Sequence, residues 1–266
     1  MSRGVVVVGV GFEPDERAVR WAAAEARDGD LDLRLVHALV LPVGHHPGWG
    51  LAVAPALRGR ARDVLLHVAA AAREVAPDLV IETRVIRGGP VPVLREQARE
   101  AEMVVVGSDG LGRVGDRLLG GVVRALAGHV DVPVAIVPAD YDPFAPHGDH
   151  APVLVADDGT PGCAGAWRFA ADRAQRRGVE LTAVRVTGGD HVDRALLDRA
   201  RGAECLVLGV GDGWFHHRTT PGVVRHALCP VVVVPPIPLA GVAGATDPSR
   251  GSRGPVSPGR PAGPRR

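Results

Sequence analysis

Runs of β-branched residues alternate with amphipathic segments along most of this chain. Val5–Val10 is almost entirely valine, which is typical of a strand that is buried on both faces. A turn containing Gly11 and Pro14 interrupts the run, and Pro14 suits the first position of a helix. From Ala18 to Ala26 the apolar residues recur at intervals of three or four, so we predict an amphipathic helix there.

The same alternation continues to residue 138 and predicts an α/β fold. Strands that alternate with helices imply parallel pairing and right-handed crossovers, hence a doubly wound, Rossmann-like sheet. The predicted strands are Val5–Val10, Leu31–Val40, Leu79–Ile86, Met103–Gly107 and Val132–Val137. The predicted helices are one that begins at Pro14, Ala61–Val75, Pro92–Ala101 and Leu118–Gly128, with a loop over residues 41–57.

After residue 151 the pattern starts again, as an internal repeat. The second copy predicts strands at Pro152–Asp157, Val179–Val186, Glu204–Gly209 and Pro230–Val234. It predicts helices from Pro161 to about Arg177, at Ala195–Arg201 and at Gly222–Ala227, with Thr160 as the N-cap of the first.

The spacing of equivalent residues shows what the second copy lacks. His37 aligns with Arg185 at an offset of 148, and Gly107 aligns with Gly209 at an offset of 102, so 46 residues are missing between them. His129 aligns with His226 at an offset of 97, so a further 5 residues are missing from the second copy between Gly209 and His226. The missing 46 correspond to one loop, one helix and one strand, so the second copy is a reduced domain of four strands.

The chain therefore divides into four predicted parts. These are a complete domain at 1–138, a linker at 139–151, a reduced domain at 152–236 and a tail at 237–266 rich in Pro, Gly and Arg. Residues 239–266 hold five arginines and one aspartate, a net charge of +4, so the rest of the chain carries −3. The tail has too few large apolar residues to offset the entropy of ordering, so we expect it to be disordered.

Composition excludes several functions. All 31 basic residues are arginine, so no lysine is present for a Walker motif, a Schiff base or a Ser–Lys dyad. A net charge of +1 argues against a general nucleic-acid binder, which would carry a strong basic excess, and no specific nucleic-acid partner is expected. Three cysteines without CxxC spacing, and no apolar run near 18 residues, favour a cytoplasmic location away from any membrane.

A glycine-rich segment follows the strand Met103–Gly107. It runs through Gly110 to Gly120, with the spacing Gly-x2-Gly-x9-Gly, and leads into the next predicted helix. Small residues at the carboxyl end of a parallel strand let backbone N–H groups approach phosphate oxygens, and a helix N-terminus favours negative charge. Ligands of open α/β sheets bind at such strand ends.

These motifs and the order of elements resemble the universal stress protein family. The resemblance includes the glycine spacing, the strand ending Leu35-Val36-His37, and two His-x3-Pro-Val endings that begin at His129 and His226. It covers both repeats, over about residues 4–236. It implies that the first domain binds ATP, with Mg²⁺ as a candidate companion, and that the last strands mediate pairing between domains. The implied nucleotide-binding residues are Gly9, Val10, Gly11, Ala38, Val106, Gly107, Gly110, Gly120, Gly121 and Val122.

Two residues depart from the family pattern. Val10-Gly11-Phe12 stands where the family has Asp-Gly-Ser/Thr, and Gly121 stands where it has Ser or Thr. The first change removes a carboxylate and the second removes a hydroxyl, although the backbone N–H groups remain. Asp158-Gly159-Thr160 in the second repeat keeps the family pattern, but the glycine-rich segment that should accompany it is too short. Turn and cap chemistry is the alternative interpretation of Asp158.

Two apolar strands, Val132–Val137 and Pro230–Val234, would each lie at the edge of its sheet. Exposed edges of this kind need covering. We therefore expect these two strands to cover each other, so that the repeats form a pseudo-dimer within one chain. A homodimer of whole chains is a further hypothesis.

The sequence thus predicts a stress-response regulator that binds an adenine nucleotide in its first domain and catalyses no reaction. Slow hydrolysis of ATP stays open, because no residue is identified as a base or as a metal ligand. The alternative is a protein-interaction or scaffold module of the same fold that no longer binds nucleotide. The departures from the family pattern at Val10 and Gly121 are the reason for this alternative.

Overall fold

Nine strands form one sheet in the order β3-β2-β1-β4-β5-β9-β8-β6-β7. The structure is a computed structural model, and it describes residues 3–41, 49–108, 121–127, 129–142, 151–186, 192–210 and 219–236. Within each repeat the strands pair in parallel, as the alternation of strands and helices predicts. The α/β, doubly wound fold class is therefore confirmed, and so is the shortened second repeat.

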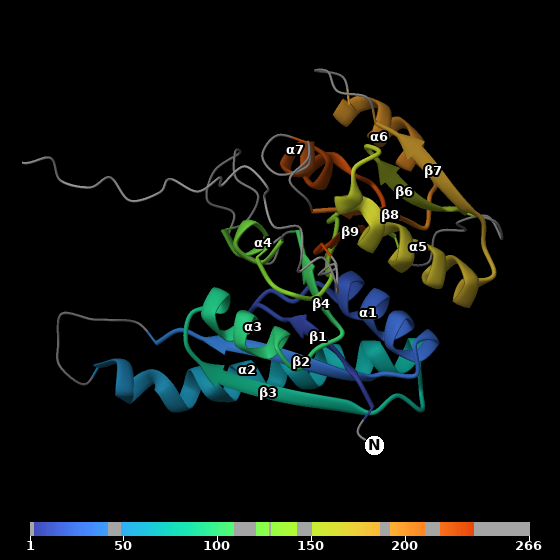
Figure 1. Cartoon of the computed structure of the whole chain (residues 1–266). Helices are drawn as coiled ribbons and strands as arrows, with labels where there is room; N and C mark the ends of the chain where they lie inside the picture. The colour runs from blue at the N-terminus through green and yellow to red at the C-terminus, as the bar shows by residue number, and fades with distance from the viewer. Residues whose placement is uncertain are drawn as a thin grey trace, which may run out of the picture.

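The first repeat, coloured blue to green in Figure 1, contributes five strands and four helices. The strands are β1 (Val5–Gly9), β2 (Asp32–Leu39), β3 (Ile81–Arg87), β4 (Met103–Gly107) and β5 (Val134–Val137). The helices are α1 (Glu16–Asp28), α2 (Trp49–Val75), α3 (Pro90–Ala98) and α4 (Gly121–Leu126).

The second repeat, yellow to red in Figure 1, contributes four strands. They are β6 (Val153–Asp157), β7 (Leu181–Arg185), β8 (Cys205–Gly209) and β9 (Val231–Val234). Its helical elements are the 3-10 turn η1 (Pro161–Cys163), α5 (Ala164–Arg177), α6 (Val192–Ala200) and α7 (Thr219–His226).

The two repeats join where β5 lies antiparallel to β9. Ala135 is opposite Val232, and Ile136 is opposite Val231. Both strands are buried along their whole length. The pairing of the two apolar edges, predicted from their composition, is therefore confirmed, and it merges two half-sheets into one.

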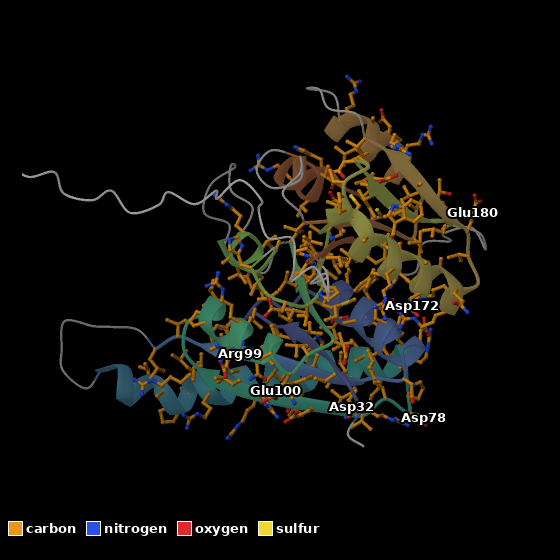
Figure 2. All side chains as sticks on the ribbon, viewed as in Figure 1. Asp32, Asp78, Arg99, Glu100, Asp172 and Glu180 are labelled. Carbon is orange, nitrogen blue, oxygen red and sulfur yellow. The ribbon has the colours of Figure 1, made fainter. Side chains whose placement is uncertain are left out.

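Helices cover both faces of this sheet. On one face α1, α2 and α5 pack on a buried layer that includes Val8, Leu35 and Val207. On the other face α3, α4, α6 and α7 pack on a second layer that includes Val106 and Leu206. Figure 2 shows Asp172 of α5 on the side of the second repeat that faces α1.

Several predicted helix boundaries were wrong. Helix α2 begins at Trp49 rather than Ala61, and Pro55 lies inside it, where a loop was predicted. The Ala- and Leu-rich residues around Pro55 have high helix propensity, which outweighs the missing hydrogen bond of one exposed proline. Helix α1 begins after an Asp15 N-cap, so Pro14 precedes the helix instead of starting it. Thr160 does lie at an N-cap position, but it precedes the 3-10 turn η1 and its side chain makes no cap hydrogen bond.

In the part of the chain that the structure describes, no helix combines the length and the apolar character that crossing a membrane requires. The predicted disordered tail at 237–266 lies outside the described residues, as does most of the linker predicted at 139–151. The division into four parts stays a prediction.

Candidate functional site

A cavity of about 200 Å³ lies at the carboxyl ends of β1, β2 and β4. The turn after β1 forms one wall, and the end of β2 forms another. Pro90 and Leu94 of α3 and Val122 of α4 close the remaining side. Parallel strands of an open α/β sheet bind their ligands at this edge, so the cavity lies where the fold favours a ligand.

Seven of the ten residues predicted to contact the nucleotide line this cavity. Gly121 is described and exposed at the start of α4, but it is not part of the lining. Gly110 and Gly120 lie outside the described residues. The seven that the structure brings together are Gly9, Val10, Gly11, Ala38, Val106, Gly107 and Val122.

Two of the lining glycines are sites of close approach. A Cβ at Gly9 would lie 2.9 Å from Cδ1 of Leu94, so the glycine lets α3 pack closely on the end of β1. A Cβ at Gly107 would lie 2.6 Å from Oδ2 of Asp15. At both strand ends the absence of a side chain therefore lets a neighbouring residue pack against the backbone of the glycine.

The wall after β1 is apolar at the positions where the family resemblance implies polar groups. Val10 is buried, and its N–H donates to the carbonyl of Val36 at 2.9 Å. The Phe12 ring lies 4.4 Å from the His37 ring, centroid to centroid, and the guanidinium of Arg60 lies 4.9 Å from the Phe12 centroid. No side-chain hydrogen-bonding group at position 10 or 12 is thus available to a ligand.

His37 is a packed residue at the end of β2. It is 2% exposed, and within the described parts of the chain neither ring nitrogen has a hydrogen-bond partner. Burial lowers the pKa of His37, which favours the neutral imidazole. These observations agree with the interpretation of His37 as a strand-end residue rather than a catalyst.

Asp15 is the residue near the cavity that sequence reasoning missed. Its side chain is 8% exposed, and Oδ1 accepts hydrogen bonds from the N–H of Arg17 at 3.1 Å and from Nε of Arg17 at 2.9 Å. Oδ2 is buried beside Gly107 and has no partner among the described residues. The signal was present, because Asp is a favoured N-cap, but assigning Pro14 to the helix start concealed it.

Comparisons with known proteins agree with this geometry. Residues 3–138 match the model of the universal stress protein family, which is half of the chain. The chain belongs to the universal stress protein family. The Universal stress protein Rv2005c of Mycobacterium tuberculosis is 36% identical over 189 residues, which are 67% of this chain and 62% of that protein. This chain therefore matches less than two thirds of the length of that relative.

Solved universal stress proteins are also similar to the chain. One from Archaeoglobus fulgidus covers 88% of this chain and 99% of its own, with a TM-score of 0.67 and 16% identity, which supports the fold. Another, solved in complex with cAMP, is 27% identical and covers 52% of this chain and 98% of its own, with a TM-score of 0.41.

The second universal-stress-type repeat uses its Asp158 for local structure. Oδ1 of Asp158 accepts from the N–H of Thr160 at 2.8 Å, from its hydroxyl at 2.6 Å and from the thiol of Cys163 at 3.0 Å. Although burial acts to raise it, these hydrogen bonds hold the pKa of Asp158 below its ordinary value. This is the turn chemistry that the sequence offered as the alternative to a ligand site.

Asp157, Asp158 and Cys163 also form a group whose potential ligand atoms lie within 4.8 Å of one another. Their oxygens already accept local hydrogen bonds, with Oδ1 of Asp157 accepting from Gly159 at 2.9 Å. Burial raises the pKa of the Cys163 thiol, which disfavours the thiolate that a metal needs. The group is therefore explained as a turn.

Proposed function

We propose that this universal stress protein binds ATP in the cavity at the carboxyl ends of β1, β2 and β4, and acts in stress response as a nucleotide-responsive regulator. One observation supports this most strongly. Residues that the family resemblance implies as nucleotide contacts come from four separate chain segments, and the fold gathers seven of them around one cavity.

The proposed role of this cavity is binding rather than catalysis. Its described lining holds glycines, apolar side chains and the buried His37, without a pair of carboxylates for acid–base work. A bound nucleotide would act by favouring one conformation or one partner complex over another. Mg²⁺ would enter with the phosphates of ATP, and the cytoplasm is the compartment proposed.

Calorimetric titration with ATP tests the proposal. Ala38 lines the cavity, so Ala38→Phe should fill it and weaken binding at least tenfold. Ala70→Phe, at an exposed position of α2, is the matched control and should bind as the unchanged protein does. Denaturing the purified protein and assaying the released nucleotide provides a second measurement. No heat at millimolar ATP together with no released nucleotide would remove the proposal.

The apolar wall at Val10 and Phe12 favours a second candidate, an interaction module of the same fold without nucleotide. The same titration separates the two, because only the first candidate predicts saturable heat that Ala38→Phe abolishes. Phosphate release from ATP, with protein in excess, tests the absence of turnover. If phosphate is released faster than in buffer alone, and Ala38→Phe suppresses this release, the protein hydrolyses ATP and the proposed absence of catalysis is wrong.

A further inference from the structure

A second cavity, of about 580 Å³, lies where the two repeats meet. Its lining includes Val6 and Met103, near the amino ends of β1 and β4, so it is at the opposite edge of these strands from the cavity described above. Residues along α5 form the wall that belongs to the second repeat. The chain that leaves β9 completes the lining through Pro235 and Pro236, after which the described part of the chain ends.

The join between the repeats has a local twofold axis. Strands β5 and β9 are equivalent at the offset of 97 residues, and they pair antiparallel. Ala135 lies opposite Val232, which is its own equivalent at this offset. The axis therefore passes between these two residues, and each site beside the join in one repeat has a counterpart in the other.

Tyr141 is buried against the second repeat. The chain that leaves β5 turns back, and the N–H of Tyr141 donates to the carbonyl of Pro138 at 3.1 Å. Tyr141 is 8% exposed, and burial raises its pKa to about 12. The groups whose charges act on its phenol all belong to the second repeat, namely Arg173, Arg177, Glu204 and Cys205.

The equivalents of these four residues all line the second cavity. Helix α5 is related to α1 by the offset of 148 residues, and β8 is related to β4 by the offset of 102. The four equivalents are Glu25, Gly29, Glu102 and Met103. Tyr141 thus fills one of two equivalent sites, and the cavity is the other.

The chain that leaves β9 is in the position to fill this other site. Ile237, Pro238 and Leu239 follow the lining residue Pro236 directly, and three residues span at most about 10 Å. Charge favours the same occupant. Residues 239–266 carry a net charge of +4, whereas the cavity lining holds four carboxylates and only two arginines.

The chemistry of this segment suits the cavity walls. Large apolar side chains line the cavity, including Leu31, Met103 and Phe169. Pro238 has no N–H and cannot repeat the hydrogen bond of Tyr141, so the segment need not follow the same turn. Proline also restricts the preceding residue to extended conformations, which reduces the entropy that is lost when the segment docks.

We propose that residues 237–239 dock in this cavity, with the side chains of Ile237 and Leu239 on its apolar walls. The docked segment is a strap that fastens the end of the second repeat to the first, beside the β5–β9 pairing. It comprises only the first three residues of the predicted tail. The strap does not depend on the proposed nucleotide site.

The reactivity of an introduced thiol tests the strap, because the three native cysteines are buried. A docked side chain is shielded from the reagent. The thiol of Leu239→Cys should therefore react with a chromogenic disulfide at least tenfold more slowly than that of Val256→Cys, which lies farther along the tail.

A side chain that blocks the cavity should release the strap. Asp172 is exposed on α5 and lines the cavity, so Asp172→Trp should raise the reaction rate of Leu239→Cys at least tenfold. Asp198→Trp, at an exposed position of α6 outside the lining, is the matched control and should leave this rate unchanged. In both cases the aspartate that is replaced pairs with an arginine three or four residues later.

A second measurement keeps the test valid if Asp172→Trp does not fold. Ile237→Ser/Leu239→Ser removes the apolar contacts of the strap and should lower the urea midpoint by at least about 0.5 M. Val242→Ser/Val256→Ser makes a similar change farther along the chain and should leave the midpoint unchanged.

Four outcomes would overturn the strap. Equal reaction rates for Leu239→Cys and Val256→Cys, or equal urea midpoints for the two double variants, show that the segment does not dock. A slow Leu239→Cys thiol that Asp172→Trp leaves slow shows that the segment docks elsewhere. If the protection is lost on dilution and light scattering gives the mass of two chains, a second copy occupies the cavity. None of these measurements involves ATP, so the proposed function is tested separately.

Discussion

The guanidinium of Arg173, on α5 of the second repeat, is paired with the carboxylate of Glu25, on α1 of the first. Arg173 is 1% exposed and also contacts Glu204 at 3.0 Å, and it lies 5.0 Å from the centre of the Trp21 ring. Although burial acts to lower it, the two carboxylates raise the pKa of Arg173. A buried charge network therefore joins the repeats beside the β5–β9 pairing.

Removing Arg173 should be severely destabilising. Arg173→Ala leaves the buried Glu25 and the partly buried Glu204 with Arg177 as their remaining counter-charge, and breaking a buried pair in this way costs about 3–5 kcal/mol. Arg99→Ala, which removes an exposed pair with Glu96, is the control and should cost no more than about 1 kcal/mol. Figure 2 shows Arg99 on the first repeat, away from the second repeat. Urea unfolding measures the loss of unfolding free energy in both variants. Equal losses would show that the buried network does not stabilise the contact between the two repeats.

Two glycines near the cavity should respond oppositely to alanine. At Gly107 a Cβ meets the Asp15 carboxylate, so Gly107→Ala must displace Asp15 and should destabilise the protein by about 1–3 kcal/mol. At Gly121 no atom of the residues that the structure describes lies within 4 Å of an added Cβ, and the residue begins a helix. Gly121→Ala should therefore be neutral or stabilise by up to about 1 kcal/mol. Thermal unfolding of the two variants makes the comparison, and a stable Gly107→Ala protein would contradict the close approach to Asp15.

The three cysteines should be unreactive in the folded protein. Cys163, Cys205 and Cys229 are free and buried. Burial raises the pKa of Cys205 and Cys229 to about 12 and also raises that of Cys163, so little thiolate forms at pH 8. Titration with a chromogenic disulfide at pH 8 should detect no fast thiol in the native protein and three in urea. A fast-reacting native thiol would show that one of these sites opens readily.

Much of this fold follows from the sequence because its signals are local and repeated. The strand Met103–Gly107 has the predicted bounds, since its apolar run ends abruptly in glycine. The β5–β9 pairing was predictable because two apolar edges in one chain need cover. The start of α2 at Trp49 was not predictable, because Pro55 alone favours a break in the helix and the helix propensity of the neighbouring residues determines whether the helix continues.

The candidate site was predictable where backbone position matters, and less so where side chains meet across the sheet. The family resemblance, which rests partly on the glycine spacing that begins at Gly107, implied the strand-end glycines Gly9 and Gly107, and both line the cavity. The contact between Asp15 and Gly107 joins residues that are distant in the chain, and no local pattern reports it. The ion pairs of Arg173 with Glu25 and Glu204 were not predictable for the same reason, since nothing in the sequence distinguishes this arginine from the others.

Stability should fall at acidic pH partly through His37. Because burial lowers its folded pKa below the unfolded value of about 6.5, the unfolded state binds the proton first as the pH falls. The contribution of His37 to stability is therefore fully present above pH 6.5 or so. It is lost at lower pH by up to about 1.4 kcal/mol per pH unit, until the folded protein also takes up the proton.

His37→Gln provides the test, because it keeps a polar side chain of similar size without a titrating ring. Its stability at pH 7.5 should be similar to or lower than that of the unchanged protein, whereas its loss of stability between pH 7 and pH 5 should be smaller. Urea unfolding across this range measures the difference in slope. His129→Gln, at an exposed position, is the matched control and should keep the original slope. Parallel curves for the unchanged protein and His37→Gln would show that His37 titrates alike in both states.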